Sequence, residues 1–143
     1  MASDAPVVPA TVRVVAAVMF DAAGRVLIAQ RPAGKSRAGM WEFPGGKLEA
    51  GESATAGLAR ELDEELGVRL QAARPLLELR HDYPELRVEL TTLLVERYAG
   101  EPAGREGQAL QWVLPAELYT VELLPADRPI VDRLQGMTGS EAS

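Results

Sequence analysis

The sequence of 143 residues contains no cysteine, and aromatic residues make up only 5% of it. Without cysteine, the chain has no disulfide framework, no thiol nucleophile and no cysteine-ligated zinc site. Basic residues are also in deficit, because 15 Lys and Arg face 21 Asp and Glu for a formal net charge of −6. Complexes with DNA or RNA polymers need a basic surface to displace condensed counterions. This balance therefore argues against a nucleic-acid polymer as the partner.

Long hydrophobic runs are missing as well. The longest, residues 14–20, is far short of the ~20 apolar residues that span a bilayer, and the start MASDAPVVPA lacks the basic and apolar regions of an export signal. We therefore expect a cytoplasmic protein with no membrane span. The hydrophobic fraction of 47% excludes a disordered chain. The length predicts one domain, residues 11–136, between a flexible leader (1–10) and a flexible tail (137–143).

The pattern of apolar runs and turn residues predicts a mixed α/β fold. Two Val-rich or apolar runs, 11–20 and 26–29, flank the turn 21–24 and predict a β-hairpin. Residues 30–51 carry many glycines and two prolines, which is typical of a long functional loop. The remaining predicted elements are strands at 68–78, 86–98 and 110–114, a helical turn at 115–118 and a closing helix at 126–134. Strands interleaved with helices predict a sheet covered by helices on both faces.

Residues 53–66 predict a helix with three glutamates on one face. Glu61, Glu64 and Glu65 have i, i+3 and i, i+4 spacing, so their charges repel one another near a helix end that disfavours anions. Arg60 can pair with Glu64 or with Glu52 in the preceding loop. Divalent Mg²⁺ or Mn²⁺, which prefer oxygen ligands, would relieve the repulsion. An ordinary acidic surface helix is the alternative, because charge runs are usually solvated faces.

The whole segment GKLEAGESATAGLARELDEELGV, residues 46–68, favours the metal site because it resembles the Nudix box at every defined position. Those positions are Gly46, Glu52, Arg60, Glu61, Leu62, Glu64, Glu65, Gly67 and Val68. WEFPGGK at 41–47 and REGQ at 105–108 resemble the MutT branch of that family, and the likeness spans roughly 11–135. It implies an α/β/α sandwich with a mixed β-sheet. It also implies metal-dependent hydrolysis of (deoxy)nucleoside triphosphates to monophosphate and pyrophosphate.

The resemblance implies a role for each acidic residue. Glu61, Glu64 and Glu65 would bind Mg²⁺ or Mn²⁺, with the Gly45 carbonyl and Glu106 as further ligands. The general base would be Glu61, Glu64 or Glu106, and the sequence does not choose among them. Taken alone, Glu106 is more typical of a loop surface charge. The segment 52–65 carries a net charge of −4 out of −6, so a small polyanion with its metal is the expected ligand.

The resemblance also implies a substrate site. Its predicted residues are Arg31, Glu42, Phe43, Pro44, Gly45 and Asp127. Arg31 would contact phosphate, with a solvent-exposed side chain as the alternative. Phe43, Trp41 and Tyr83 are candidates for stacking on the base, although aromatic side chains more often belong to the core.

Asp127 departs from the MutT branch, in which an Asn at this position reads the purine edge. An ionised Asp only accepts hydrogen bonds, and 8-oxoguanine offers three donors, its N1–H, its 2-amino group and its N7–H. This favours 8-oxo-dGTP and a role in nucleotide-pool sanitisation and DNA repair. Hydrolysis of CTP or a modified dCTP is the alternative, because similar Asp-containing sequences occur in that branch. The competing structural interpretation makes Asp127 the N-cap of the final helix.

A nucleotide-binding sensor on the same scaffold, without catalysis, is the rival from another functional class. Such a module is expected to lose carboxylates of the box, and this sequence has them all. The resemblance leaves the oligomeric state open between monomer and homodimer.

Overall fold

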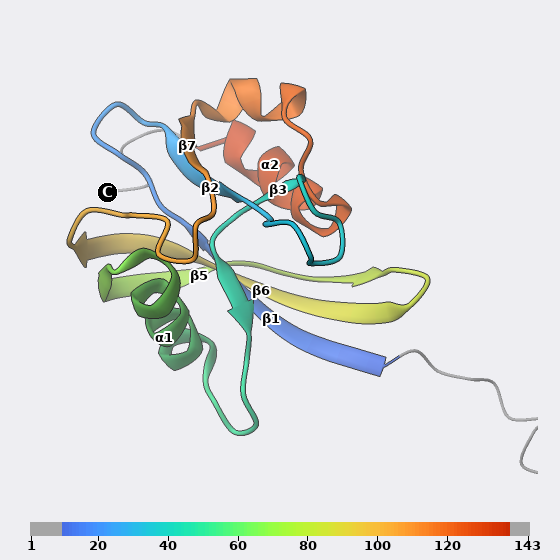
Figure 1. Ribbon diagram of the computed structural model, residues 1–143. Coiled ribbons are helices and arrows are strands. Elements are labelled where there is room, and N and C mark those ends of the chain that lie inside the picture. The colour runs from blue at the N-terminus through green and yellow to red at the C-terminus, as the bar shows by residue number, and fades with distance from the viewer. Residues whose placement is uncertain (1–9, 138–143) are drawn as a thin grey trace, which may run out of the picture.

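The computed structural model describes residues 10–137, which form two β-sheets flanked by helices (Figure 1). The larger sheet has the strand order β4-β1-β6-β5, and the smaller one has the order β3-β2-β7. The elements are β1 (Ala10–Val18), β2 (Val26–Gln30), β3 (Trp41–Glu42), β4 (Gly45–Lys47), α1 (Ala54–Leu66), β5 (Arg69–Asp82), β6 (Leu86–Ala99), β7 (Leu110–Val113), the 3₁₀ turns η2 (Pro115–Thr120) and η3 (Pro125–Asp127), and α2 (Arg128–Gln135). Strands β1 and β6 are parallel and their other neighbours antiparallel, so the larger sheet is mixed, as predicted.

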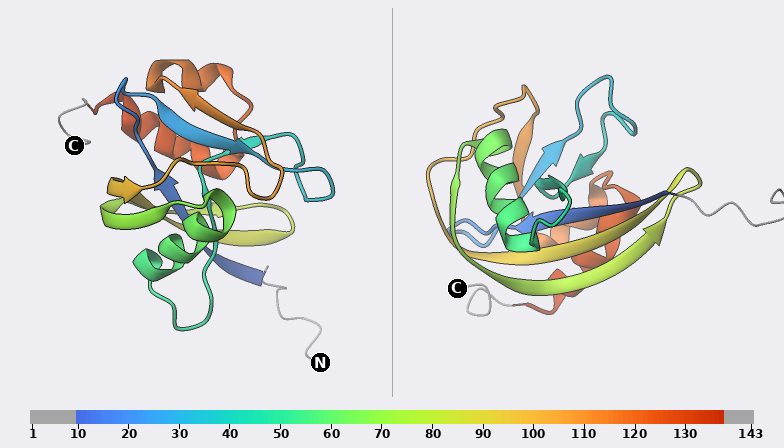
Figure 2. Two further views of the ribbon diagram at one scale, coloured as in Figure 1. Left: turned by 60° about the vertical axis from the view of Figure 1, so that its left-hand side comes forward. Right: turned by 90° about the horizontal axis from the view of Figure 1, so that it is seen from below.

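Strand β1 supplies two hydrophobic cores from its two faces. Successive strand side chains point to opposite faces of a sheet, and accordingly Val15 and Ala17 pack in one core while Ala16 and Val18 pack in the other. Helix α1 covers the first core with Leu58, Leu62 and Leu66, and α2 covers the second with Ile130, Val131 and Leu134. Figure 2 shows the two helices on opposite sides of the larger sheet. The predicted α/β/α sandwich is confirmed.

Helix α1 begins and ends where the sequence predicts. The Ser53 hydroxyl accepts a hydrogen bond from the Ala56 N–H at 3.1 Å, which is the N-cap arrangement. Gly67 at the other end adopts the left-handed conformation, with φ of 70°. The predicted strands 68–78, 86–98 and 110–114 correspond to β5, β6 and β7, and the helical turn at 115–118 is η2.

The predicted hairpin between residues 11–20 and 26–29 is wrong, because the two strands belong to different sheets. Strand β1 lies between β4 and β6, whereas β2 lies between β3 and β7. Only the turn forms as expected, with a bridge between Phe20 and Val26. Strand β2 is buried at four of its five residues, and β1 is buried on both faces over its last four residues, 15–18. A strand of that kind is typical of the middle of a sheet, where it has neighbours on both edges.

The segment 30–51 is irregular for most of its length, as predicted, but it contains the short strands β3 and β4. Strand β3 pairs with β2 in the smaller sheet, and β4 pairs with β1 in the larger one. Residues 41–47 therefore cross from one sheet to the other.

The predicted leader, 1–10, and tail, 137–143, lie outside the described residues except for Ala10, the first residue of β1, and Met137. Within residues 10–137, no helix is long and apolar enough to cross a membrane.

Candidate active site

A cavity of about 600 Å³ is lined by residues of both sheets, of α1 and of the loops around residues 31–37, 106–108 and 124–127. Its volume lies within the range of ~300–1,000 Å³ that is usual for small-molecule sites. Of the predicted site residues, the cavity brings together Arg31, Glu42, Phe43, Gly45, Glu61, Glu65, Glu106 and Asp127. Glu64 and Pro44 do not line it. The Pro44 carbonyl instead accepts a hydrogen bond from the Ala17 N–H at 2.7 Å.

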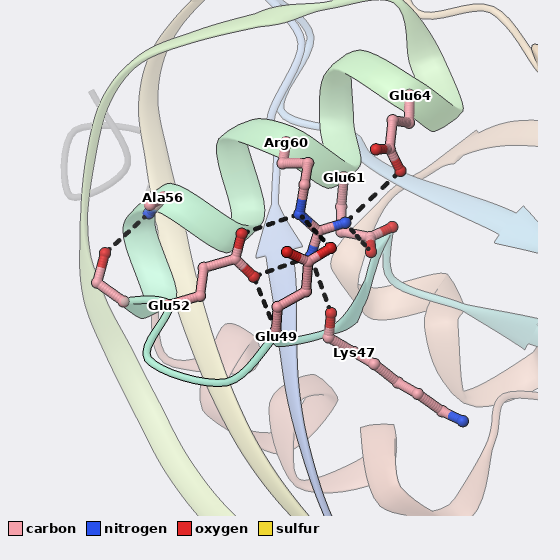
Figure 3. Close-up of polar contacts among 8 residues, drawn as sticks. Lys47, Glu49, Glu52, Ala56, Arg60, Glu61 and Glu64 are labelled. Atoms are coloured by element: carbon pink, nitrogen blue, oxygen red, sulfur yellow. Dashed lines mark hydrogen bonds and ion pairs between the residues drawn. The ribbon is translucent and has the colours of Figure 1, made fainter.

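Arg60 connects α1 to the loop that precedes it (Figure 3). Its guanidinium donates to the Glu52 carboxylate at 2.9 Å, to the Lys47 carbonyl at 3.0 Å and to the Glu61 carboxylate at 2.9 Å. Hydrogen bonds from Arg60 lower the pKa of Glu52 to about 2. A guanidinium suits this role because its donors are fixed in one plane and reach several acceptors at once. Arg60 therefore fixes both the loop and the Glu61 side chain.

Glu64 stands apart from the other two glutamates of α1. Its side chain is 56% exposed and lies 3.5 Å from the Arg60 guanidinium (Figure 3). It does not line the cavity, whereas Glu61 and Glu65 do. The Glu61 side chain, in contrast, is only 13% exposed. The role of Glu64 as metal ligand or base stays a prediction.

Three carboxylates gather at one end of the cavity, which we call the acidic end: Glu61, Glu65 and Glu106. Burial raises the pKa of the Glu65 carboxyl, and the hydrogen bond and charge of Glu61 and the charge of Glu106 raise it further. Gly46 lets the Glu61 carboxylate lie against the backbone, because a Cβ there would come within 2.5 to 2.7 Å of its atoms. The acidic end thus concentrates more negative charge than its surroundings neutralise.

The donors at the acidic end fit a hard divalent cation. As they are placed, no group of three or more Asp, Glu or His side chains among residues 10–137 is arranged to hold a metal ion. Their chemistry is nonetheless suitable, since Glu61, Glu65 and Glu106 offer carboxylate oxygens and Gly45 lines the same cavity. A cation would also relieve the repulsion that raises the pKa of Glu65. These residues could therefore hold Mg²⁺ or Mn²⁺.

Asp127 lies at a second end of the cavity, which we call the Asp127 end. Its side chain is 5% exposed, and its Oδ2 accepts a hydrogen bond from the Phe43 N–H at 3.0 Å. Burial raises its pKa to about 7, and this hydrogen bond acts in the opposite direction. The interpretation of Asp127 as the N-cap of the final helix is wrong for its side chain, which accepts no hydrogen bond from the first turn of α2. The chain enters α2 through η3, so Asp127 has helical backbone angles in place of the extended ones of a cap.

Of the predicted stacking residues, Tyr83 and Phe43 line the cavity, and Tyr83 is the more exposed of the two. Its hydroxyl accepts a hydrogen bond from the Ala126 N–H at 3.1 Å, next to Asp127. The guanidinium of Arg37 lies 3.9 Å above its ring and forms two hydrogen bonds with Glu85, at 2.8 and 3.2 Å. Phe43 belongs to the buried core with 3% exposure, and Trp41 packs against that core. No pattern in the sequence indicates the pair of Arg37 and Glu85, because 48 residues separate them.

Arg31 reaches the cavity but is already bonded. It donates to the Glu42 carboxylate at 3.1 Å and to the Ser36 carbonyl at 2.7 Å. Burial raises the pKa of Glu42, and Arg31 opposes that rise. Lys35 and Arg37 line the same cavity, so the loop brings three cations to it where the sequence analysis named one. All three cations lie within seven residues of one glycine-containing loop, and this clustering is the sequence pattern that indicates a site for an anion.

Comparisons with known proteins agree with this geometry. Residues 15–133 match the NUDIX domain. The 8-oxo-dGTP diphosphatase of Escherichia coli is 36% identical over 110 residues, which cover 77% of this chain and 85% of the relative. The CTP pyrophosphohydrolase of the same organism is 36% identical over 123 residues, or 86% and 91% of the two chains. A MutT structure from work on Aliivibrio salmonicida and Vibrio cholerae superposes with a TM-score of 0.75 at 34% identity and covers 87% and 96% of the chains.

Proposed function

This chain belongs to the Nudix hydrolase family of nucleotide pyrophosphohydrolases, and we propose that it hydrolyses 8-oxo-dGTP to the monophosphate and pyrophosphate. The observation that carries the proposal is that a single cavity joins the acidic end to the Asp127 end. Such a cavity has room for a phosphate chain at one end and a base at the other. Arg31, Lys35 and Arg37 line it too, and their charges favour a polyanionic ligand.

At the acidic end, Nudix chemistry needs a divalent metal ion. We assign its ligands to Glu61, Glu65 and Glu106, with the Gly45 carbonyl as a further candidate. When bound, Mg²⁺ or Mn²⁺ would neutralise phosphate oxygens and lower the pKa of a water molecule. Glu61 and Glu106 are better placed than Glu64 to accept the proton of the attacking water, because both line the cavity. Arg60 holds Glu61 in position through the hydrogen bond of 2.9 Å.

At the Asp127 end, the carboxylate would select the base. Its Oδ2 already accepts the Phe43 N–H, and the described residues make no other hydrogen bond to the side chain. The remaining oxygen is therefore available to accept donors of the base. 8-Oxoguanine offers two donors on its Watson–Crick edge, the N1–H and the 2-amino group, and a third on the opposite edge, the N7–H, so either edge can donate to this carboxylate. Tyr83, which lines the same cavity, is the candidate for stacking.

A cytosine nucleotide is the second candidate. The relative named CTP pyrophosphohydrolase is as similar to this chain as the relative named 8-oxo-dGTP diphosphatase, at 36% identity. The amino group of cytosine can donate to Asp127, but it supplies only one kind of donor. 8-Oxoguanine therefore offers Asp127 more hydrogen-bond donors than cytosine does.

Pyrophosphate release from a panel of nucleotides with Mg²⁺ tests the proposal. The panel contains 8-oxo-dGTP, dGTP, CTP, dCTP, 5-methyl-dCTP and ADP-ribose. We expect the highest kcat/KM for 8-oxo-dGTP with its N7–H facing Asp127, at least about tenfold above dGTP, because a site that pairs with this added donor rejects the analogue without it. A higher value for CTP would select the second candidate. Absence of turnover for all members would indicate the sensor.

Asp127→Ala tests the assignment of the base-reading residue. We expect its kcat/KM to fall more for the preferred nucleotide than for the others. Asp132→Ala is the matched control, since Asp132 is an exposed residue of α2 whose carboxylate accepts from the Tyr119 hydroxyl. An equal loss for every nucleotide would mean that Asp127 supports the fold and does not read the base.

A further inference from the structure

The loop of residues 100–109 covers the C-terminal end of α1 and carries Glu106. The last carbonyls of a helix have no partner within the helix and carry partial negative charge. Helix α1 has no basic residue in its last turn, and the loop supplies the missing donors. These donors are Arg105 Nη1 to the Asp63 carbonyl (2.9 Å), Arg105 N–H to the Glu65 carbonyl (3.0 Å) and Ala103 N–H to the Leu66 carbonyl (3.0 Å).

The side chain of Gln108 forms a bridge within this arrangement. Its Nε2 donates to the Glu65 carbonyl at 3.1 Å, and its Oε1 accepts from the Glu106 N–H at 2.9 Å. Because the carbonyl only accepts and the N–H only donates, these two partners determine the orientation of the amide. One half-buried side chain therefore joins the backbones of Glu65 and Glu106.

The side chain of Glu106 makes few contacts that fix its position. Its residue is exposed, and its carboxylate forms no hydrogen bond or ion pair within the described part of the chain. It lies within a turn, residues 104–107, in which the Gly107 N–H donates to the Gly104 carbonyl at 3.0 Å. Its carboxylate is nonetheless close enough to Glu65 for its charge to act on that residue. The position of Glu106 at the cavity therefore depends on how its backbone is held.

We propose that Gln108 is a positioning residue, which holds Glu106 beside Glu65 at the acidic end so that both carboxylates can bind one metal site. This inference rests on the proposed function, which places both glutamates among the metal ligands. Groups that orient a ligand by hydrogen bonds, without touching the metal, typically change metal affinity or activity by about 10- to 100-fold when they are removed. Gln108 makes its hydrogen bonds to the backbone of two such residues, and the bond to the Glu65 carbonyl anchors the amide that holds the Glu106 N–H.

The test variant is Gln108→Met, which removes both hydrogen bonds with little change in length and none in charge. Gln135→Met in α2 is the matched control, because Gln135 Nε2 also donates to two carbonyls, those of Pro115 at 2.8 Å and Val131 at 3.0 Å, and does not line the cavity. The first measurement is Mn²⁺ affinity, from the electron paramagnetic resonance of the free ion. We expect Gln108→Met to raise the Kd for Mn²⁺ by about tenfold or more. Gln135→Met should change this Kd by less than about twofold, which we count as unchanged.

Two further measurements distinguish positioning from general stabilisation. Exchange of the Glu106 amide hydrogen should accelerate in Gln108→Met, because that N–H loses its acceptor. In a Glu106→Gln background, Gln108→Met should no longer change the Kd for Mn²⁺, since the residue through which it acts is already altered. An undiminished effect in that background, or unchanged exchange of the Glu106 amide, would overturn the proposal.

The same data separate this inference from the proposed function. If no nucleotide is hydrolysed but Gln108→Met still weakens Mn²⁺ binding through Glu106, the proposed function fails and the positioning role stands. If 8-oxo-dGTP is hydrolysed but Gln108→Met behaves like Gln135→Met in every measurement, the positioning role fails alone. Absence of Mn²⁺ binding by the unaltered protein would contradict the metal ligands and, with them, the inference.

Discussion

The two ends of the cavity each contain a buried carboxyl group with a raised pKa, but they balance its charge in different ways. Burial is the leading cause for both Glu65 and Asp127. At Glu65 the neighbouring Glu61 and Glu106 add to the rise, whereas at Asp127 the Phe43 N–H opposes it. The acidic end therefore accumulates charge that a cation would neutralise, whereas at the Asp127 end only the charge of Glu42 adds to the rise, which suits Asp127 to hydrogen bonding. We therefore expect a carboxylate-to-amide substitution to remove repulsion between carboxylates at the acidic end and to remove a pH-dependent cost of ionisation at the Asp127 end.

The largest expected effect is that of Glu65→Gln. We expect kcat to fall by about 1,000-fold even with saturating Mg²⁺, the upper range for losing one preorganised electrostatic group. The metal-free protein should at the same time become more heat-stable, because a neutral amide removes the repulsion from Glu61 and Glu106. Steady-state kinetics and thermal unfolding in EDTA measure the two effects. Glu64→Gln is the control and should lose less activity, since Glu64 is exposed; the reverse order would contradict the assignment of ligands.

Asp127→Asn should change stability in a pH-dependent way. The folded pKa of about 7 lies above the ordinary value for Asp of 3.8, so the stabilising contribution of this carboxyl is complete below pH 3.8 and is lost as the pH rises through 7. An Asn can still accept the Phe43 N–H and does not ionise. The free energy of unfolding of the variant should therefore equal that of the unaltered protein at low pH and exceed it at pH 8, by on the order of 4 kcal/mol.

Urea unfolding at pH 5, 6, 7 and 8 measures this difference. Asp132→Asn, on the exposed side of α2, is the control and should show no such trend. A constant difference between Asp127→Asn and the unaltered protein across this range would mean that Asp127 stays ionised in the folded state.

Arg60→Lys tests how strongly the acidic end depends on the loop before α1. Lysine keeps the charge but not the planar set of donors that reaches Glu52, Glu61 and the Lys47 carbonyl. We expect the Mg²⁺ concentration for half-maximal activity to rise about tenfold. Arg25→Lys, at an exposed ion pair with Asp21, is the control and should leave it unchanged. An unchanged Mg²⁺ requirement in Arg60→Lys would mean that the charge alone suffices.

The smallest expected effect is that of Arg37→Ala at the Asp127 end. The substitution removes the contact with the Tyr83 ring and the ion pair with Glu85, which are worth little because they are partly exposed. We expect KM for the nucleotide to rise about two- to fivefold, with kcat unchanged. Arg87→Ala, which removes the ion pair with Asp82 in the same hairpin, is the control. A larger loss in kcat than in KM would place Arg37 in the chemistry of the acidic end.

Local patterns explain which elements could be predicted from the sequence. Helix α1 has its cap, apolar stripe and stop within 15 residues, so its ends were correct. The hairpin of β1 and β2 was wrong because strand runs that are apolar on both faces do not show which neighbours they take. Sequence spacing likewise placed Glu61, Glu64 and Glu65 on neighbouring positions of one helix. It does not show which of them faces a cavity.

By itself, the sequence determined the carboxylate helix, the resemblance to the Nudix box and the expected metal chemistry, because all of these depend on residues within about two dozen positions of one another. Only the tertiary structure decided that Glu64 stays outside the cavity, that Asp127 bonds to Phe43 and not to its own helix, and that Gln108 bridges two glutamates. The bonded partners are 84 residues apart for Asp127 and 43 for Gln108. Contacts over such distances arise from the packing of two sheets and two cores, and no local pattern records them.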